Sequence, residues 1–157
     1  MKEVSAGLLM YRRRQGILQV LLVHPGGPFW KNKDAGAWSL PKGRADHGEE
    51  GEQLLDVAKR EFEEETGTKP EGEFVYLARV TRGRDGKTVD AWMFEGDLDA
   101  GNIRSNTITI DWPPRSGRTM EIPEVDRGEF FTIEEAKVKI SEYQRGFIDA
   151  FEKAMTL

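Results

Sequence analysis

A chain of 157 residues is long enough for one hydrophobic core and too short for two ordinary domains, so we expect one domain over residues 1–157. The absence of cysteine excludes disulfides, thiolate metal sites and a cysteine nucleophile. The net charge of −5 disfavours a general nucleic-acid-binding surface, and no stretch is long and apolar enough to span a membrane. With no export signal near the N-terminus, we expect the cytoplasm as the location.

The first segment has the pattern of a β-hairpin. Residues 4–12 alternate between two faces, with Val4, Ala6, Leu8 and Met10 on one and Ser5, Gly7, Leu9 and Tyr11 on the other. The basic run from Arg12 to Gly16 is interpreted as a solvated turn. Residues 17–23 return as a strand that is apolar enough to lie inside a sheet.

A loop with aromatic and basic residues follows the hairpin. Residues 24–30 combine proline and glycine with Phe29 and Trp30, and Lys31 and Lys33 come next. Such a loop could stack a base on Trp30 and attract phosphates, or it could be a surface loop packed by its own aromatic side chains. Residues 37–40 predict a short strand that leads to Lys42, a candidate phosphate contact or a solvated lysine.

Residues 52–66 predict a helix, because they are good helix formers and Gly67 follows as a stop signal. At about 100° per residue, one stripe of the helix is apolar. It consists of Leu54, Leu55, Ala58 and Phe62. Glu52, Asp56 and Glu63 fall on the opposite, solvated side.

Three further acidic residues of this helix do not fall on the solvated side. Glu65 projects close to the apolar stripe and Glu61 to its edge, and Glu64 is three residues from Glu61 and adjacent to Glu65. Neighbouring like charges destabilise a helix, and carboxylates near a core are costly unless paired or bound to metal. Mg²⁺ would resolve the conflict, since it prefers carboxylate oxygens. The alternative is a solvated acidic face, with Arg60 in an ordinary surface ion pair.

After the helix, two strands are predicted at residues 74–81 and 88–97, joined by a turn at 84–87. Trp92 and Phe94 share one face of the second strand, which favours a place in the core over a platform for a base. Residues 97–102 resemble a calcium loop only faintly and lack its later acidic ligand, so they are interpreted as a turn.

The segment 104–118 combines an edge strand at residues 107–110 with a loop that contains Trp112, Arg115 and Arg118. An aromatic ring beside two guanidinium groups suits a nucleotide substrate. The alternative is a basic surface loop with a packed tryptophan.

The last part predicts a strand at residues 129–133 and two helices at 134–140 and 141–155. Thr132 and Glu135 have the spacing of a capping box. The final helix has a buried stripe of Phe147, Ile148, Phe151 and Met155. The order of strands, helix, strands and helices predicts an α+β fold, with helices on both faces of a mixed sheet.

The sequence REFEEETG at residues 60–67 resembles the REUxEExG core of the Nudix box, in which U is a bulky apolar residue. The run Leu40-Pro41-Lys42-Gly43 is similar to the entry of that box. The full pattern, Gx5Ex7REUxEExGU, is matched from Glu52 onward except at Thr68, where it has an apolar residue. Eight residues rather than five separate Gly43 from Glu52, so the loop 44–51 is expanded by three.

The resemblance implies a Nudix-like α/β/α sandwich and a Mg²⁺-dependent hydrolase, with Mn²⁺ able to replace Mg²⁺. The implied metal ligands are Glu61, Glu64, Glu65, the Gly43 carbonyl and a downstream glutamate, Glu124 or, failing that, Glu121. Glu61 would be a ligand or the base. Arg60 would orient Glu61, and Glu52 would have a supporting role. The expanded loop could instead displace Gly43 from the metal.

The implied substrate is a nucleoside diphosphate linked to another group. The aromatic and basic loops favour dinucleoside polyphosphates such as diadenosine tetraphosphate, and the candidate binding residues are Trp30, Lys42, Trp112, Arg115 and Arg118. Nucleoside triphosphates, nucleotide sugars and capped RNA are alternatives within the family. A non-catalytic nucleotide- or RNA-binding module and an acidic interaction domain are alternatives outside catalysis. Among nucleic acids only RNA 5′ ends are considered as partners, and the oligomeric state is left open, including a homodimer.

Overall fold

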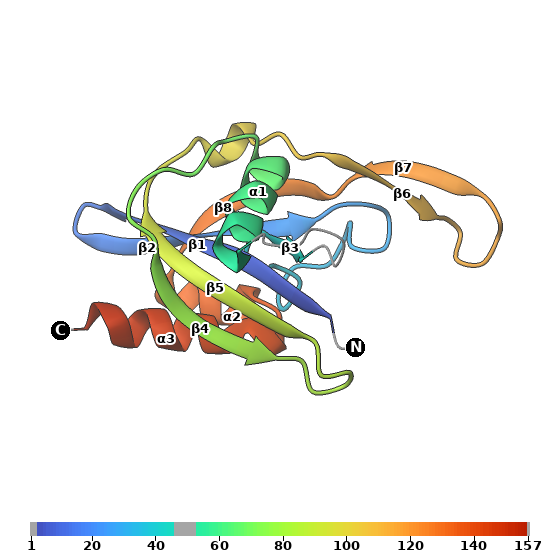
Figure 1. The fold of residues 1–157 in the computed structure, drawn as a ribbon. Helices are drawn as coiled ribbons and strands as arrows, with labels where there is room; N and C mark the ends of the chain where they lie inside the picture. Colours follow the sequence, from blue (N-terminus) through green and yellow to red (C-terminus); the bar gives the residue numbers. More distant parts are fainter. Residues whose placement is uncertain (1–2, 46–52, 157) are drawn as a thin grey trace.

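The structure is a computed structural model that describes residues 3–45 and 53–156. Its centre is a mixed sheet (Figure 1). Across this sheet the strands are β4 (Val75–Thr81), β5 (Thr88–Glu95), β1 (Val4–Arg14), β2 (Ile17–Pro25) and β8 (Val125–Thr132). The β1–β5 pair is parallel, and the other pairs along this order are antiparallel.

A short strand, β3 (Lys42–Arg44), shares one edge of β1 with β2. β3 pairs with the beginning of β1, and β2 pairs with its end. The backbone of residues 41–42 lies close to Gly7 of β1: a Cβ atom on Gly7 would lie 2.8 Å from both the Pro41 carbonyl oxygen and the Lys42 Cβ. Glycine at position 7 therefore allows the chain to place Lys42 and Gly43 on the sheet.

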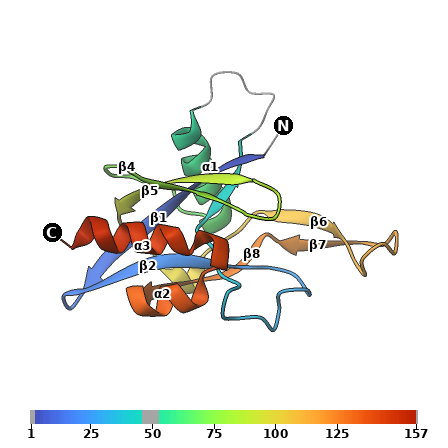
Figure 2. The same ribbon diagram turned by 90° about the horizontal axis from the view of Figure 1, so that it is seen from below.

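Helices cover both faces of the sheet, as Figures 1 and 2 show. α1 (Leu54–Thr66) lies on one face, while α2 (Ile133–Lys139) and α3 (Arg145–Met155) lie on the other. Two short 3₁₀ helices, η1 (Ala100–Asn102) and η2 (Glu142–Gln144), complete the helical elements of the described residues. The predicted α/β/α sandwich is confirmed. None of the described helices is long and apolar enough to cross a membrane.

The core has two parts, one on each side of the sheet, and β1 contributes to both. Leu8 and Met10 pack toward Phe62 of α1, whereas Leu9 packs with the cluster that contains Phe147 of α3. The alternation predicted for residues 4–12 is therefore confirmed. So are the helix stop at Gly67, which has a left-handed φ of 78°, and the Thr132–Glu135 capping box.

Several predicted boundaries are wrong. β1 continues to Arg14, and a two-residue turn with positive φ at Gln15 and Gly16 replaces the longer turn expected from Arg12. Arg12 stays in the strand because its guanidinium stacks on Phe130, 3.6 Å from the ring centroid, and bonds to Asp97 at 2.8 Å.

Two other predicted elements differ from the structure. Residues 37–40 do not form a strand. Ser39 makes an isolated bridge to Val23 in β2, and Trp38 makes one to Ile140 after α2, so consecutive residues pair with two different segments. The predicted last helix is divided into η2 and α3. Glu52 and most of the loop 44–51 lie outside the described residues.

A separate antiparallel hairpin of β6 (Thr107–Asp111) and β7 (Thr119–Pro123) extends away from the main sheet (Figure 1). β6 was predicted from the sequence, whereas β7 was missed. Ile108 pairs with Ile122 and Ile110 with Met120, so the hairpin has one largely apolar face. The edge strand predicted at residues 107–110 is therefore confirmed as β6, and the loop predicted after it is the hairpin turn.

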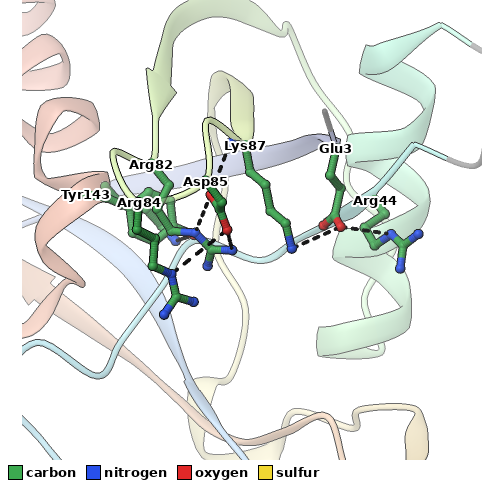
Figure 3. A network of polar contacts seen from close by, with 8 residues as sticks. Glu3, Arg44, Arg82, Arg84, Asp85, Lys87 and Tyr143 are labelled. Atoms are coloured by element: carbon green, nitrogen blue, oxygen red, sulfur yellow. Dashed lines mark hydrogen bonds and ion pairs between the residues drawn. The ribbon is translucent and has the colours of Figure 1, made fainter. Parts of the chain in front are cut away.

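A polar network ties β3 to the ends of the neighbouring strands (Figure 3). The Glu3 carboxylate lies 3.2 Å from Lys87 Nζ and 3.5 Å from Arg44 Nε. In the adjacent turn, Arg82 bonds to Asp85 at 2.6 Å, and this hydrogen bond lowers the pKa of Asp85 to about 2. The Glu3–Arg44 ion pair is the contact of this network that reaches β3.

Candidate active site

The carboxylates of interest come from the C-terminal half of α1. Ala58 and Phe62 are fully buried, and the same buried side of the helix continues with Glu61 and Glu65, which are 9% and 4% exposed. Glu63 is exposed. The predicted position of Glu65 near the apolar stripe is thus confirmed, and the helix carries acidic groups where most helices carry apolar ones.

Glu61 lies directly against the backbone of β3. A Cβ atom on Gly43 would fall 2.0 to 2.4 Å from the carboxylate atoms of Glu61, so only glycine leaves room for this contact. Arg60 Nη1 lies 3.1 Å from Glu61 and 3.6 Å from Glu64. Burial and the charge of Glu64 raise the pKa of Glu61 to about 7, against the opposing effect of Arg60. The chain therefore keeps Gly43 beside Glu61 despite the expanded loop.

Glu65 is held from the same strand. Its carboxylate accepts a hydrogen bond from the backbone N–H of Lys42, and the Lys42 ammonium group provides a favourable charge. Burial, followed by the nearby charge of Glu124, nevertheless raises the pKa of Glu65 well above its ordinary value. Glu61, Glu65 and Glu124 are thus close enough to repel one another.

Glu124 stands between β7 and β8 and is tied to the segment before β6. Its Oε1 accepts a hydrogen bond of 2.9 Å from the side-chain amide of Asn106, and its backbone N–H donates to the Asn106 carbonyl oxygen at 3.0 Å. Glu121, the other downstream candidate, is exposed on β7 beside the buried Ile122. Strand alternation places Glu121 on the opposite face from Ile122, so the geometry favours Glu124.

A small pocket of about 180 Å³ brings the polar groups together. Lys42, Glu65 and Glu124 contribute its charged lining, and Val23, Pro25 and Leu40 belong to its apolar side. The pocket therefore presents an ammonium group and two carboxylates from three separate parts of the chain.

An apolar cavity of about 440 Å³ adjoins this pocket. Its aromatic lining is Phe29 and Trp30 from the loop after β2 and Trp112 from the end of β6, and its aliphatic lining includes Ile108, Ile110 and Ile122. Pro25 and Glu124 line both spaces. Trp30 and Trp112, which were singled out separately from the sequence, thus line one cavity that meets the carboxylates at Glu124.

The loop that carries Trp30 is anchored by a buried histidine. His24 is fully buried, and its two ring nitrogens lie 2.6 Å from the Lys33 carbonyl oxygen and 2.9 Å from Asp126 Oδ1. Lys33 Nζ also lies 3.5 Å from the ring centroid of Phe29. The loop is therefore packed by its own side chains, and stacking of a base on it stays a prediction.

The remaining predicted binding residues lie farther out. Arg115 and Arg118 are exposed on the turn of the β6–β7 hairpin and do not line the apolar cavity. Sequence reasoning also missed Asn106, because an isolated asparagine in a loop has no spacing that marks it. The alternation of Ile108, Ile110 and Trp112 was the available signal for the cavity-facing side of β6.

The donor set suits a divalent cation. Within residues 3–45 and 53–156 no three His, Asp or Glu side chains form a ready-made metal cluster. Mg²⁺ is usually held by one or two carboxylates with water and substrate phosphates as its other ligands, so it needs no such cluster. Buried carboxylates that raise each other's pKa fit a cation of this kind, because it would compensate their charge.

A larger open groove of about 680 Å³ lies elsewhere, between Arg12, Arg14, Asp97 and Phe130. Its two arginines are both bonded to Asp97 at 2.8 Å. The charges of this groove are therefore compensated within the protein, and its residues do not indicate a reaction.

The comparisons with known proteins agree with this architecture. The model of the NUDIX domain family matches residues 1–151. No curated protein matches the sequence.

The chain is similar in structure to several solved proteins. For the NUDIX domain of Shewanella oneidensis NrtR complexed with ADP ribose, the TM-score is 0.69 at 16% identity, over 99% of this chain and 90% of that chain. For a binary complex of the C. elegans Ap4A hydrolase, it is 0.64 at 19% identity, over 98% and 97%. For the MutT protein from Methanosarcina mazei Go1, it is 0.64 at 19% identity, over 99% and 96%. At these identities the likeness supports the fold.

Proposed function

The chain belongs to the NUDIX domain family of pyrophosphohydrolases, and we propose that it cleaves a pyrophosphate bond in a nucleoside diphosphate linked to another group. One observation carries the proposal: Glu124 lines both the apolar cavity and the pocket that contains Glu65 and Lys42. A nucleoside in the apolar cavity would therefore direct its phosphates toward the carboxylates of α1.

Mg²⁺, or Mn²⁺ in its place, is the proposed cofactor. When bound, such an ion neutralises phosphate charge and lowers the pKa of a bound water molecule. Glu64 and Glu65, with the Gly43 carbonyl and Glu124, are the residues that would hold it.

The protein groups around this site have separate proposed roles. Glu61 is a further ligand or the base that accepts a proton from the attacking water. Its contact with Arg60 and its close fit against Gly43 hold the carboxylate in one orientation. The Lys42 ammonium, on the wall of the small pocket, is placed to contact a substrate phosphate.

A dinucleoside polyphosphate, such as diadenosine tetraphosphate, is the proposed substrate. Trp30 and Trp112 provide aromatic surface for one base, since every base has a face that can stack. Arg115 and Arg118 lie exposed on the turn just beyond Trp112. They could pair with the additional phosphates or the second nucleoside end of such a substrate.

Charge-removing variants of α1 test this assignment. Glu64→Gln and Glu65→Gln should each lower kcat by about 100-fold or more, because they remove negative oxygen ligands from the proposed metal site. Glu63→Gln is the matched control, since Glu63 belongs to the same acidic run and is exposed. Circular dichroism should show an intact helix in all three. Full activity in Glu64→Gln, with Mg²⁺ present, would refute the metal assignment.

A further inference from the structure

Asn106 connects two of the proposed metal-binding residues, although it belongs to neither α1 nor the Nudix box. Its backbone N–H donates to the Glu64 carbonyl oxygen at 2.8 Å, and its own carbonyl oxygen accepts from the Glu124 N–H at 3.0 Å. Its side-chain amide donates to Glu124 Oε1 at 2.9 Å. A single residue thus fixes the Glu124 carboxylate relative to the end of α1.

We propose that Asn106 is a positioning residue that holds the Glu124 carboxylate in the orientation needed to bind a divalent cation. The inference rests on the proposed function, because it takes Glu124 as a metal ligand. The side-chain amide donates to one carboxylate oxygen, Oε1. This hydrogen bond would leave the other oxygen, Oε2, available to a cation.

Electrostatics explains why Glu124 needs such a partner. Glu124 lies near both Glu61 and Glu65, and neighbouring carboxylate charges repel one another. Before a cation binds, this repulsion favours rotation of the Glu124 side chain away from α1. A neutral amide opposes that rotation without cancelling the charge that attracts the cation, whereas a lysine or arginine at position 106 would compete with the metal.

Other hydrogen bonds hold the backbone around Asn106, so a variant without the Asn106 side chain should keep this backbone in place. Ser105 Oγ accepts a hydrogen bond from the Val125 N–H at 3.0 Å, and the Arg104 N–H donates to the Thr66 carbonyl oxygen at 3.0 Å. The two backbone bonds of Asn106 would also remain. We therefore expect variants at this position to fold with the parent's helix content.

The test is the affinity for Mn²⁺ alone, measured without substrate from the electron paramagnetic resonance signal of the free ion. Asn106→Ala and the similarly sized Asn106→Leu should bind Mn²⁺ about tenfold or more weakly, as expected for loss of a group that orients a ligand. Asn102→Ala is the control, because Asn102 on the exposed η1 donates a similar side-chain hydrogen bond to Asp99, the N-cap of that helix.

The double variant Asn106→Ala/Glu124→Gln separates a positioning role from a direct one. If Asn106 acts through Glu124, the double variant binds Mn²⁺ no more weakly than Glu124→Gln alone. An additional tenfold loss in the double variant would overturn the proposal, as would unchanged affinity in both single Asn106 variants while Glu124→Gln binds weakly. If Glu124→Gln binds like the parent, Glu124 is no ligand and the proposed metal site itself is wrong.

Discussion

Two acidic side chains of α1 occupy positions where a charge is costly. Glu61 and Glu65 are each less than one tenth exposed, and their nearest compensation is the Arg60 guanidinium for one and the Lys42 N–H for the other. Groups with pKa values perturbed by burial and by specific neighbours concentrate at functional sites. At the scale of single residues, the conflict in α1 is therefore best explained by a ligand that carries positive charge.

The raised pKa of Glu61 predicts how stability depends on pH when no metal is bound. This pKa is about 7 in the folded protein, whereas the ordinary value for a glutamate is 4.5, so between these values the folded state binds more protons than the unfolded state. The contribution of Glu61 to the free energy of unfolding is present below about pH 4.5 and is lost as the pH rises through 7. The full difference corresponds to about 3 kcal/mol.

Thermal denaturation in EDTA measures this effect. Glu61→Gln should remove part of the decline between pH 4.5 and 7 and should melt at a higher temperature than the parent at neutral pH. Glu63→Gln, which changes an exposed side chain, should melt as the parent does. Parallel curves for the parent and Glu61→Gln would show that Glu61 titrates normally.

At the scale of elements, the β6–β7 hairpin has the clearest consequence for substrate binding. Trp112 lines the apolar cavity, and stacking of a base on an aromatic side chain is worth about 1 to 3 kcal/mol. Trp112→Ala should therefore raise KM by about 10-fold, with a much smaller effect on kcat. Thr109→Ala is the control, since strand alternation places Thr109 on the face of β6 opposite Ile108 and Ile110. An unchanged KM in Trp112→Ala would show that Trp112, and with it this part of the hairpin, does not contact the substrate.

The loop after β2 should respond to the loss of its buried anchor. His24→Ala removes two hydrogen bonds, to the Lys33 carbonyl oxygen and to Asp126, and leaves a cavity in place of a fully buried ring. We expect a loss of about 2 to 4 kcal/mol in the free energy of unfolding. Because this loop carries Trp30, KM should rise more than kcat falls.

This expectation is checked by measuring the kinetics and the denaturation of two single variants, His24→Ala and Asp126→Asn. Asparagine at position 126 keeps an acceptor for the histidine ring, so its effects should be smaller. A variant His24→Ala that is destabilised but has the parent's KM would mean that the loop does not position the substrate.

The elements that could be predicted from the sequence are those with their own periodicity or end signals. α1 has an apolar stripe and a terminal glycine, and β1 alternates over its length. β3 and β7 could not be predicted, since β3 has only three residues and depends on pairing with the distant β1, and β7 depends on pairing with β6. The extension of β1 through Arg14 likewise depends on pairing with β2, in which Arg14 is opposite Ile17.

At the scale of the whole molecule, the same distinction applies to the candidate site. Glu61, Glu64 and Glu65 share one helix, so their proximity follows from local geometry. The shared cavity of Trp30 and Trp112 and the hydrogen bond from Asn106 to Glu124 depend on the tertiary fold, in which the β6–β7 hairpin lies against the loop after β2. The fold and the clustering of these carboxylates on one helix were therefore predictable, whereas the link between the apolar cavity and the carboxylates was not.

We propose that the small pocket and the apolar cavity together form the site of a metal-dependent pyrophosphohydrolase. The most direct test of this proposal measures hydrolysis of four compounds, each with and without Mg²⁺: diadenosine tetraphosphate, ADP-ribose, a nucleotide sugar and a nucleoside triphosphate. We expect Mg²⁺-dependent release of nucleotides, fastest from diadenosine tetraphosphate. No hydrolysis of any compound in Mg²⁺ or Mn²⁺, while nucleotides still raise the melting temperature, would contradict the claim and indicate a non-catalytic nucleotide-binding module.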